Sequence, residues 1–526
     1  MSNYSESDFI IPAIIAMGKR GGKISTTELI SVLSDFFQPD GDDVKIIKNR
    51  SDTFFSQKVR NLKAHNTIGK HGYAKTTEDG WMLTNEGELI YEKLQGLLAT
   101  SRYNFPSFSG NFQSVFRPYI TAIKSKPFLL LAGISGTGKS RIVREFAFKS
   151  CPKYLQDKDG TTPGNYCMIE VKPNWHDSTE LLGYYSNLNQ KYQFTKFVKF
   201  LVKAKMFSNV PFFVCLDEMN LAPVEQYFAE ILSILETRKH PKSDPNSIKT
   251  EVIIEARYFK DLEEVKLNYS KGSDTLNKPM TDRQIYMELF GIKAGEEDDI
   301  VEETNKYDLT TEGLTLPDNI LIIGTVNMDD TTHQFSRKVI DRAMTIEMNG
   351  GKLANMYGGS KDLEYLDEEE QQKWQQAFKQ HYVTADEVLE KHPEMAKDIT
   401  EKLPQRLDEI NQALKGTPFE VSYRVLNELT IMVGVMLDEK GEEANIDNVI
   451  NQAVDNILLM KILPRIEGDS EMFAIKGSNK TRLDLLKEIA PTIEPAEKGT
   501  YRQTAKDKIQ EMIDRLNNQE FTRFWP

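Results

Sequence analysis

The sequence predicts an α/β protein, in which a parallel sheet with helices on both faces follows a small α+β region and precedes a helical region. Three observations lead to this class. From about 111 to 350, short apolar runs alternate with helical patterns, which is typical of a parallel sheet. From 351 to 526 almost every segment has helical periodicity, and residues 1–100 combine three amphipathic helices with a hairpin pattern. At 526 residues the chain is too long for one core, so separate domains are expected.

Residues 1–100 have the element order of a winged helix, which is three helices followed by a hairpin. The hairpin is expected because two short strand patterns flank the turn-forming pair Asp79-Gly80. The helices are expected at 8–19, 26–37 and 53–65, and the strands at 72–76 and 81–84. A linker rich in turn formers, 103–110, follows this region.

The same region is locally basic. Between Val44 and Lys75, eight lysines and arginines face one acid, Asp52. A surface that contacts DNA phosphates has this character. A winged helix can also dock proteins, and a basic surface can be merely solvated, so a protein-docking role stays open. The candidate DNA contacts are Lys58, Arg60, Lys63, Lys70 and Lys75.

A complete phosphate-binding loop follows the apolar run 128–132. Residues 133–140 have the pattern G-x-x-x-x-G-K-S and precede a predicted helix at 141–150. Glycines let backbone N–H groups surround phosphates, Lys139 supplies a cation, and the Ser140 hydroxyl can bind Mg²⁺. The helix also directs its positive end at the same anion. We therefore expect a nucleoside triphosphate site formed by Gly133, Ser135, Gly136, Thr137, Gly138, Lys139 and Ser140.

The apolar run 212–216 ends in two acids, Asp217 and Glu218. A strand buried on both faces has this composition, and open α/β sheets bind ligands at the carboxyl ends of their strands. We expect Asp217 to hold Mg²⁺ through water and Glu218 to polarise the attacking water, so the site would hydrolyse as well as bind nucleotide. An acidic pair after a strand can also be a helix N-cap. The phosphate loop upstream favours the catalytic interpretation.

A third apolar run, 319–326, delivers Asn327 to the same edge of the predicted sheet. An amide at this place can orient the attacking water. Arg337 and Arg342 follow, and arginines here can reach a neighbouring subunit's site and stabilise charge in the transition state. An asparagine turn and a solvated basic helix are the alternatives.

Residues 240–318 fit the strand and helix pattern poorly. They contain Pro241, Pro245 and the acidic run 295–299, with a weakly periodic stretch at 283–290. A structureless loop of this length is unusual in a compact domain. An insertion with its own small elements is therefore expected.

Composition excludes several classes of protein. A content of 39% hydrophobic and 28% charged residues is ordinary for a soluble globular protein, and the net charge of -13 argues against nucleic-acid binding over the whole surface. Cys151, Cys167 and Cys215 form no C-x-x-C pair, so neither a zinc site nor a disulfide framework is expected. No run of about 18 apolar residues and no signal-peptide pattern is present, so a cytoplasmic protein without a membrane span is expected.

With these motifs, the chain resembles the AAA+ ATPases, and within them the McrB-like motor subunits of modification-dependent restriction systems. The resemblance spans roughly residues 111–470, and segments 174–184 and 327–342 discriminate best among families that share a phosphate loop. The segments that carry it are 133–140, 171–184, 216–220, 327–343 and 419–428, and residues 457–468 are similar to that family's lid.

The resemblance implies an AAA+ three-layer sheet domain with an all-α lid. It also implies a sensor-1 role for Asn327, an arginine finger at Arg342 or Arg337, and a sensor-2-like role for Arg424. Asn327 and Asp330 have the spacing of an element associated with guanine recognition in McrB proteins. The same asparagine is needed near the γ-phosphate, so ATP and GTP both stay open as substrates.

The resemblance further implies a homo-oligomeric ring, expected to be a hexamer, that couples DNA recognition to a separate McrC-like nuclease. The chain has no nuclease motif of its own. Two alternatives come from other classes. One is a MoxR-like chaperone that remodels a protein complex, and the other is a DNA-binding regulator switched by nucleotide hydrolysis.

Overall fold

The structure is a computed structural model that describes most of the chain. The described residues are 9–37, 39, 43–47, 52–91, 113–156, 160–188, 190–242, 247–259, 309–328, 333, 335–348, 363–440, 445–493 and 503–525. The chain divides into two compact units, Met1–Arg102 with Pro495–Tyr501 and Tyr103–Glu494 with Arg502–Pro526. Within the described ranges, each helix is too short or too polar to cross a lipid bilayer. The expected linker at 103–110 lies outside these ranges.

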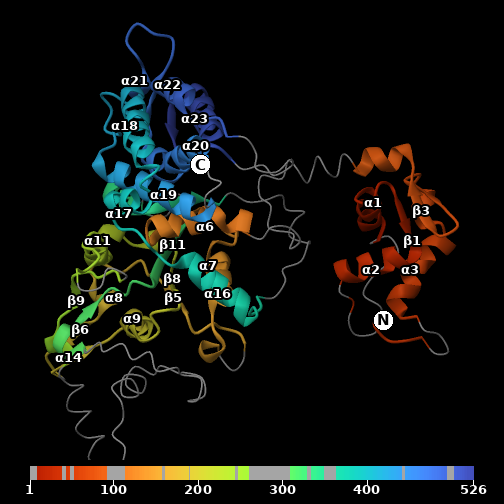
Figure 1. Ribbon diagram of the computed structural model, residues 1–526, viewed down its shortest axis with the longest axis horizontal. Coiled ribbons are helices and arrows are strands. Elements are labelled where there is room, and N and C mark those ends of the chain that lie inside the picture. Colours follow the sequence, from red (N-terminus) through yellow and green to blue (C-terminus); the bar gives the residue numbers. More distant parts are fainter. Residues whose placement is uncertain are drawn as a thin grey trace, which may run out of the picture. The chain divides into compact units, whose positions relative to one another are not determined.

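The N-terminal unit consists of short helices and a three-stranded antiparallel sheet (Figure 1). Strand β3 is central and pairs with both β1 and β2. Phe9, Phe55 and Trp81 are buried in its core. The elements are α1 (Ile10–Gly18), β1 (Lys23–Ser25), α2 (Thr26–Phe37), α3 (Phe54–Ala64), α4 (Thr67–Lys70), β2 (Ala74–Thr76) and β3 (Gly80–Leu83). Strand β1 was not predicted, because three residues show too little alternation to be recognised.

The hairpin between β2 and β3 differs slightly from the predicted one. Gly80 does not lie in the turn but begins β3, and the Thr77 N–H donates to the Gly80 carbonyl over 2.9 Å. A Cβ atom on Gly80 would lie 2.1 Å from the Ile24 carbonyl oxygen. Glycine is therefore required here by the close approach of β1, not by the turn.

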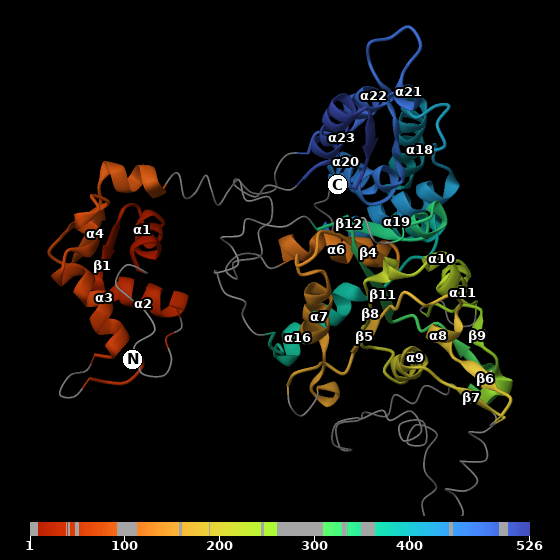
Figure 2. The ribbon, with the colours of Figure 1, turned by 180° about the vertical axis from the view of Figure 1, so that it is seen from behind.

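The larger unit is built on a five-stranded parallel sheet with the order β12-β4-β11-β8-β5 (Figures 1 and 2). The strands are β4 (Phe128–Gly133), β5 (Tyr166–Glu170), β8 (Phe212–Asp217), β11 (Ile320–Asn327) and β12 (Met344–Glu347). The three inner strands are continuous apolar runs, as strands covered on both faces require. Asn327 pairs in register with Gly133, so these strand ends meet at one edge of the sheet.

Helices cover both faces of this sheet, which gives three layers. Alternate residues of β4 point to opposite sides: Leu129 and Leu131 join one hydrophobic core, whereas Phe128 and Leu130 join the other. The first face is covered by α6 (Gln113–Ser125), α7 (Lys139–Ser150) and α16 (Glu368–Phe378). The second is covered by α8 (Thr179–Leu182), α9 (Lys196–Met206), α10 (Val224–Tyr227) and α11 (Ala229–Leu235).

Two antiparallel strand pairs extend this layered core. Strands β6 (Tyr184–Ser186) and β7 (Lys191–Gln193) form a hairpin before α9. Strand β9 (Val252–Ile254) pairs with β10 (Leu314–Thr315), which follows α14 (Leu309–Glu312). Because β9 pairs with β10, the first and last described parts of the expected insertion at 240–318 lie side by side. Its periodic stretch at 283–290 and acidic run at 295–299 lie outside the described residues.

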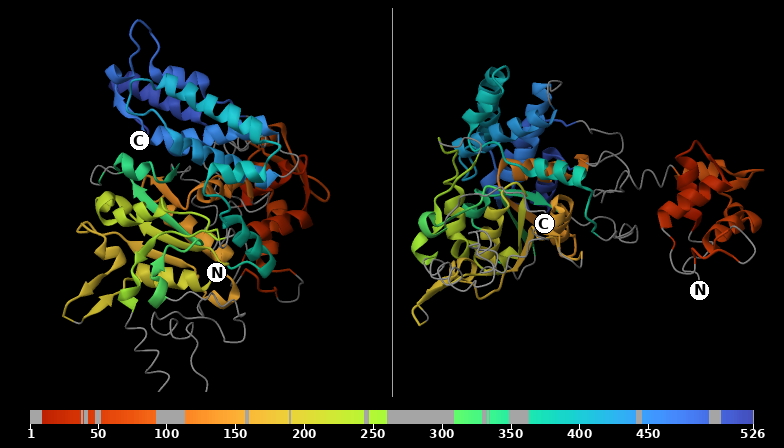
Figure 3. Two further views of the ribbon diagram at one scale, coloured as in Figure 1. Left: turned by 60° about the vertical axis from the view of Figure 1, so that its left-hand side comes forward. Right: turned by 60° about the horizontal axis from the view of Figure 1, so that its bottom comes forward.

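The C-terminal region is mainly a bundle of helices (Figure 3). Its helices are α17 (Ala385–Lys391), α18 (Ala396–Ala413), α19 (Tyr423–Lys440), α20 (Ile446–Ile457), α21 (Ser470–Phe473), α22 (Arg482–Ile489) and α23 (Ala505–Gln519). Helix α20 continues into a π-helical turn, Leu458–Ile462, and a 3₁₀ turn, Leu463–Arg465.

Two predictions for residues 351–526 need correction. The region is not all-α, because β13 (Glu467–Asp469) pairs antiparallel with β14 (Phe521–Arg523). Strands of three residues are too short to interrupt a helical pattern visibly. In addition, α16 packs on the sheet domain instead of on the bundle: Trp374 contacts Phe116 with 5.5 Å between ring centroids. The apolar face of α16 does not by itself specify which surface this helix covers.

Candidate nucleotide site

The phosphate loop connects β4 to α7 at the carboxyl edge of the sheet. Gly136 and Gly138 have φ angles of +81° and +83°, which glycine adopts without strain. A Cβ atom on Gly133 would lie 2.1 Å from the Met348 carbonyl oxygen, because the chain leaving β12 passes directly over the loop. The Met348 N–H donates to the Ala132 carbonyl over 2.6 Å. Glycine at 136 and 138 is therefore favoured by the local backbone conformation. Glycine at 133 is favoured by the close approach of the chain that leaves β12.

Lys139 and Ser140 begin α7, so both lie at the positive end of a 12-residue helix. The Lys139 ammonium group donates to the carbonyl oxygens of Gly133 (2.9 Å) and Ile134 (2.8 Å). Its cation is thus held over the loop itself, where phosphates would be recognised. Ser135 and Gly136 are exposed at the loop's tip, whereas Thr137 is buried.

Asp217, the last residue of β8, faces the start of α7. Its Oδ1 atom accepts hydrogen bonds from the hydroxyls of Ser140 (2.6 Å) and Thr325 (2.8 Å). A hydroxyl and a carboxylate converging beside a phosphate loop are hard oxygen ligands, which suit Mg²⁺ when the remaining ligands are waters and phosphates. This pair of oxygens therefore fits the expected metal. Among the described residues, no group of three or more His, Cys, Asp and Glu side chains forms a metal site of its own.

Glu218 and Asn327 meet at the ends of neighbouring strands. The Asn327 amide donates to Glu218 Oε1 over 2.7 Å. Glu218 has a φ of +51°, an uncommon conformation for a residue other than glycine, and its N–H donates to the Thr325 hydroxyl over 2.9 Å. The Asn220 amide donates to the Asn327 carbonyl over 2.8 Å. The backbone on both sides of the pair is therefore held in place.

Sequence reasoning missed Thr325 and Asn220. Thr325 joins the two acids, because its hydroxyl donates to the Asp217 carboxylate and accepts from the Glu218 N–H. A signal for it existed: Thr325 is the one hydroxyl in the buried run Ile320–Val326, and it lies two residues before Asn327 on the same face of β11. No local pattern marks Asn220, whose partner is distant in sequence.

The finger candidate Arg342 lies at the other edge of the sheet. It comes just before β12, whose Met344 is in register with Leu129 near the start of β4. The loop begins at Gly133, four residues further along β4, which corresponds to about 13 Å at 3.3 Å per residue. Arg342 is therefore far from the phosphate loop of its own chain.

Arg424 lies beside Arg342, not beside the phosphate loop. Arg424 Nη2 is 3.0 Å from Glu236 Oε2, and Arg342 Nε is 3.8 Å from Glu236 Oε1. Both arginines thus share one carboxylate at the C-terminal end of α11. Arg337, on the short helix α15 (Arg337–Ile340), stacks over the Phe419 ring at 5.0 Å. Asp330 lies outside the described residues.

The five candidate DNA contacts belong to the N-terminal unit. Arg60 Nε is 3.3 Å from the Asp52 carboxylate, and the Lys63 ammonium donates to the Glu78 carbonyl over 2.6 Å. Lys70 and Lys75 are exposed at the end of α4 and on β2. Lys58 is half-buried on α3. Arg60 and Lys63 thus make contacts within their own unit.

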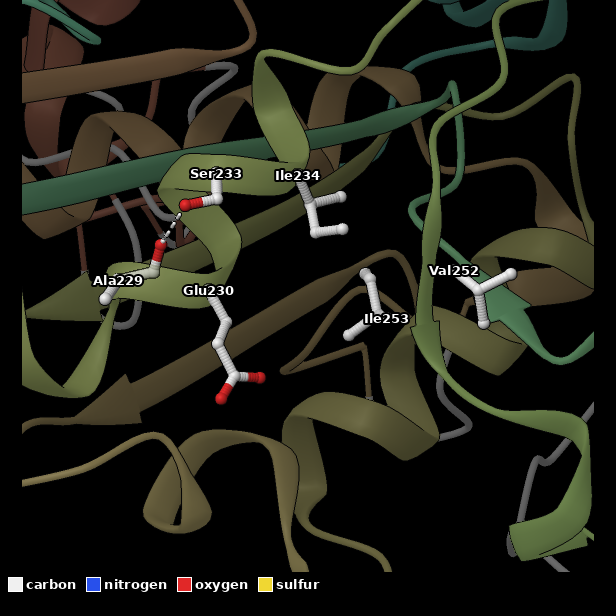
Figure 4. Close-up of a pocket in the computed structure, with 6 residues that line it drawn as sticks. All are labelled: Ala229, Glu230, Ser233, Ile234, Val252 and Ile253. Carbon is white, nitrogen blue, oxygen red and sulfur yellow. Dashed lines mark hydrogen bonds between the residues drawn. The ribbon is translucent and has the colours of Figure 1, made fainter.

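A separate pocket lies between α11 and β9, with a volume of about 260 Å³ (Figure 4). Its lining combines the apolar side chains of Ile234 and Ile253 with the Glu230 carboxylate. Glu230 accepts a hydrogen bond from the Ser178 hydroxyl over 2.6 Å. None of the candidate nucleotide residues lines this pocket.

Comparison with known proteins gives little beyond this geometry. Residues 371–521 match a family described as a domain of unknown function (DUF8727). No curated protein matches the chain. A crystal structure from Cytophaga hutchinsonii, described as a candidate ATPase, is similar over 76% of this chain and 92% of that chain, with 14% identity and a TM-score of 0.33. A TM-score of 0.33 is too low for this likeness to indicate a function.

Proposed function

We propose that this chain is an AAA+ nucleoside triphosphatase that hydrolyses ATP or GTP. The observation that supports this most strongly is the hydrogen-bonded set at the phosphate loop. Ser140, Asp217 and Thr325 are joined directly, and Glu218 and Asn327 complete the set from the adjoining strand ends. Three neighbouring strands contribute to it, as expected for a site at the carboxyl edge of a parallel sheet.

Each side chain has a role in this proposal. Lys139 and the loop N–H groups bind the β- and γ-phosphates, and Ser140 and Asp217 hold Mg²⁺, which neutralises phosphate charge when bound. Glu218 takes a proton from the attacking water, and Asn327 orients both that water and the Glu218 carboxylate. Thr325 keeps the two acids in register.

The active form in this proposal is a homo-oligomeric ring, expected to be a hexamer. The location of Arg342 and Arg424 supports it, because both lie at the edge of the sheet opposite to their own phosphate loop. An arginine there can stabilise transition-state charge only in the site of a neighbouring copy. Arg342 is the preferred finger, and Arg337 is the second candidate.

A mixing experiment tests the shared site. Arg342→Ala lacks the finger but keeps its own nucleotide site, whereas Lys139→Ala lacks nucleotide binding but keeps its finger. We expect each variant alone to be inactive and the mixture to recover turnover. If the mixture stays inactive although both variants assemble, Arg342 is not the finger, and Arg337→Ala is then mixed in the same way.

We further propose that the chain is the motor subunit of a McrBC-like restriction or anti-phage defence system. Its support is the resemblance in residues 111–470 together with the basic surface of the N-terminal unit. In this role the N-terminal unit is a winged helix that binds DNA, and a separate McrC-like nuclease cuts the DNA. The contacts of Arg60 and Lys63 within their unit favour a second candidate, a MoxR-like remodelling ATPase whose N-terminal unit docks proteins.

Turnover measurements with ATP and with GTP, each with and without DNA, test this proposal. We expect Mg²⁺-dependent hydrolysis that rises when duplex DNA is added. A turnover rate that does not change when DNA is added would favour the remodelling candidate. A complete lack of turnover by the assembled protein with either nucleotide would refute both.

A further inference from the structure

A buried lysine of the C-terminal bundle binds the backbone of the segment that carries Arg342. Lys461, on the π-helical turn after α20, donates from its ammonium group to the carbonyl oxygens of Asp341 (2.6 Å) and Ala343 (3.1 Å). These are the residues directly before and after Arg342. The Lys461 side chain is fully buried. Its role is therefore internal and is directed at the backbone on both sides of the proposed finger.

The Lys461 ammonium group has all of its partners in this one place. Its third contact is an ion pair with the Glu428 carboxylate of α19, at 2.8 Å. Lys126 approaches the same carboxylate at 2.6 Å. Although burial opposes ionisation of Glu428, the two lysines lower the pKa of its carboxyl group below the ordinary value. Burial lowers the pKa of the Lys461 ammonium group to about 8, with Glu428 acting in the opposite direction, so the ion pair is retained below that pH.

A second contact ties the same segment to the same turn. Arg465 Nε is 3.0 Å from Asp341 Oδ1. The short helix α15 ends at Ile340 and β12 begins at Met344, so only three residues join them. Carbonyl groups that follow a helix lack partners within it and are readily bound by a cation. Lys461 fills that need and holds the joining residues against the bundle.

We propose that Lys461 is a positioning residue for the arginine finger. Through Lys461, the C-terminal bundle is coupled to the active site of the neighbouring subunit. This inference rests on the proposed shared site. Movement of the π-helical turn would move the backbone of Arg342, and π-helical turns in α-helices are frequent at functional positions. The effect of Lys461 is thus felt in the partner's nucleotide site and not in its own.

The test is a complementation assay on the full chain. Lys461→Met should bind nucleotide within about 2-fold of the wild type but turn over roughly 10²-fold more slowly, as expected for a reacting group displaced by about 1 Å. Adding excess Lys139→Ala subunits should restore its turnover, because they supply an intact finger. Mixing Lys461→Met with Arg342→Ala should restore nothing, since both lack the finger function.

Loss of a buried lysine can also unfold a protein. In Lys461→Met the Glu428 carboxylate stays paired with Lys126 at 2.6 Å. The double variant Lys461→Met/Glu428→Gln leaves Lys126 with Glu236 at 3.5 Å and should show the same complementation. The matched control is Lys508→Met, which removes another fully buried lysine of the C-terminal region, 2.5 Å from Glu347 at the opposite end of β12. Its defect should lie in its own nucleotide site, so Lys139→Ala subunits should not rescue it.

The outcomes separate the two proposals. If Arg342→Ala is rescued by Lys139→Ala but neither Lys461 variant is, the positioning role is wrong and the shared site stands. If no mixture recovers activity although all variants assemble, the shared site itself is wrong. Wild-type turnover by folded Lys461→Met would also overturn the positioning role.

Discussion

Replacing Thr325 by valine removes one hydroxyl from the candidate nucleotide site and keeps the branched shape of the side chain. That hydroxyl is buried, donates to the Asp217 carboxylate and accepts from the Glu218 N–H. The variant leaves the Glu218 N–H without its partner and leaves the Asp217 carboxylate with Ser140 alone among the contacts described above. Replacing this one hydroxyl by a methyl group therefore removes a hydrogen bond from each of the two proposed functional acids.

The expected magnitude follows from these two hydrogen bonds. A bond to a carboxylate contributes about 1.5–3 kcal/mol, and a bond between neutral groups about 0.5–1.5 kcal/mol. Thr325→Val should therefore lower the free energy of unfolding by about 2–4.5 kcal/mol. Turnover should fall by roughly 10- to 100-fold, because the metal ligand and the general base lose their common support.

The chain offers a matched control in Thr345, on the edge strand β12 of the same sheet. Thr345 is equally buried, but its hydroxyl has no hydrogen-bond partner among the described residues. Thr345→Val should change the stability by no more than about 0.5 kcal/mol and leave turnover unchanged. Thermal unfolding without nucleotide and steady-state hydrolysis at saturating Mg²⁺-nucleotide measure the two effects. If the two variants behave alike, the bridging role of Thr325 is refuted.

Three further predictions concern the other candidate residues. Lys139→Ala should weaken binding of a fluorescent nucleotide by at least about 10-fold, because a charge-assisted contact to phosphate is lost; wild-type affinity would contradict the assignment of the loop. Glu218→Gln should still bind Mg²⁺-nucleotide but hydrolyse it about 10²-fold more slowly, and unchanged turnover would mean that this side chain is only structural. DNA affinity of the full chain should fall with salt at a slope of about -0.9 per phosphate contact. Charge reversal at Arg60 and Lys63 should reduce the magnitude of that slope for every duplex sequence in gel-shift titrations, whereas an unaltered slope would favour protein docking.

The sequence indicated most elements of the sheet because each leaves a local trace. Apolar runs such as 128–132 and 212–216 end in polar residues at the edge where loops meet, and the structure has parallel strands at both. The edge strands β5 and β12 of this sheet were not predicted individually. Strands β1, β13 and β14 were missed, since three residues carry no measurable periodicity. The partner of α16 was also missed, because an apolar helix face does not specify which surface it will cover.

The sequence by itself determined the residues that a phosphate site needs, since loop, lysine, hydroxyl and acids are recognised from short patterns. Only the tertiary structure decided how they meet. Strand β11 lies between β4 and β8, which brings Thr325 to Asp217 and Asn327 to Glu218 across about a hundred residues of chain. The docking of the bundle likewise brings Lys461 to the backbone around Arg342. Such contacts depend on strand order and packing, which no local pattern encodes.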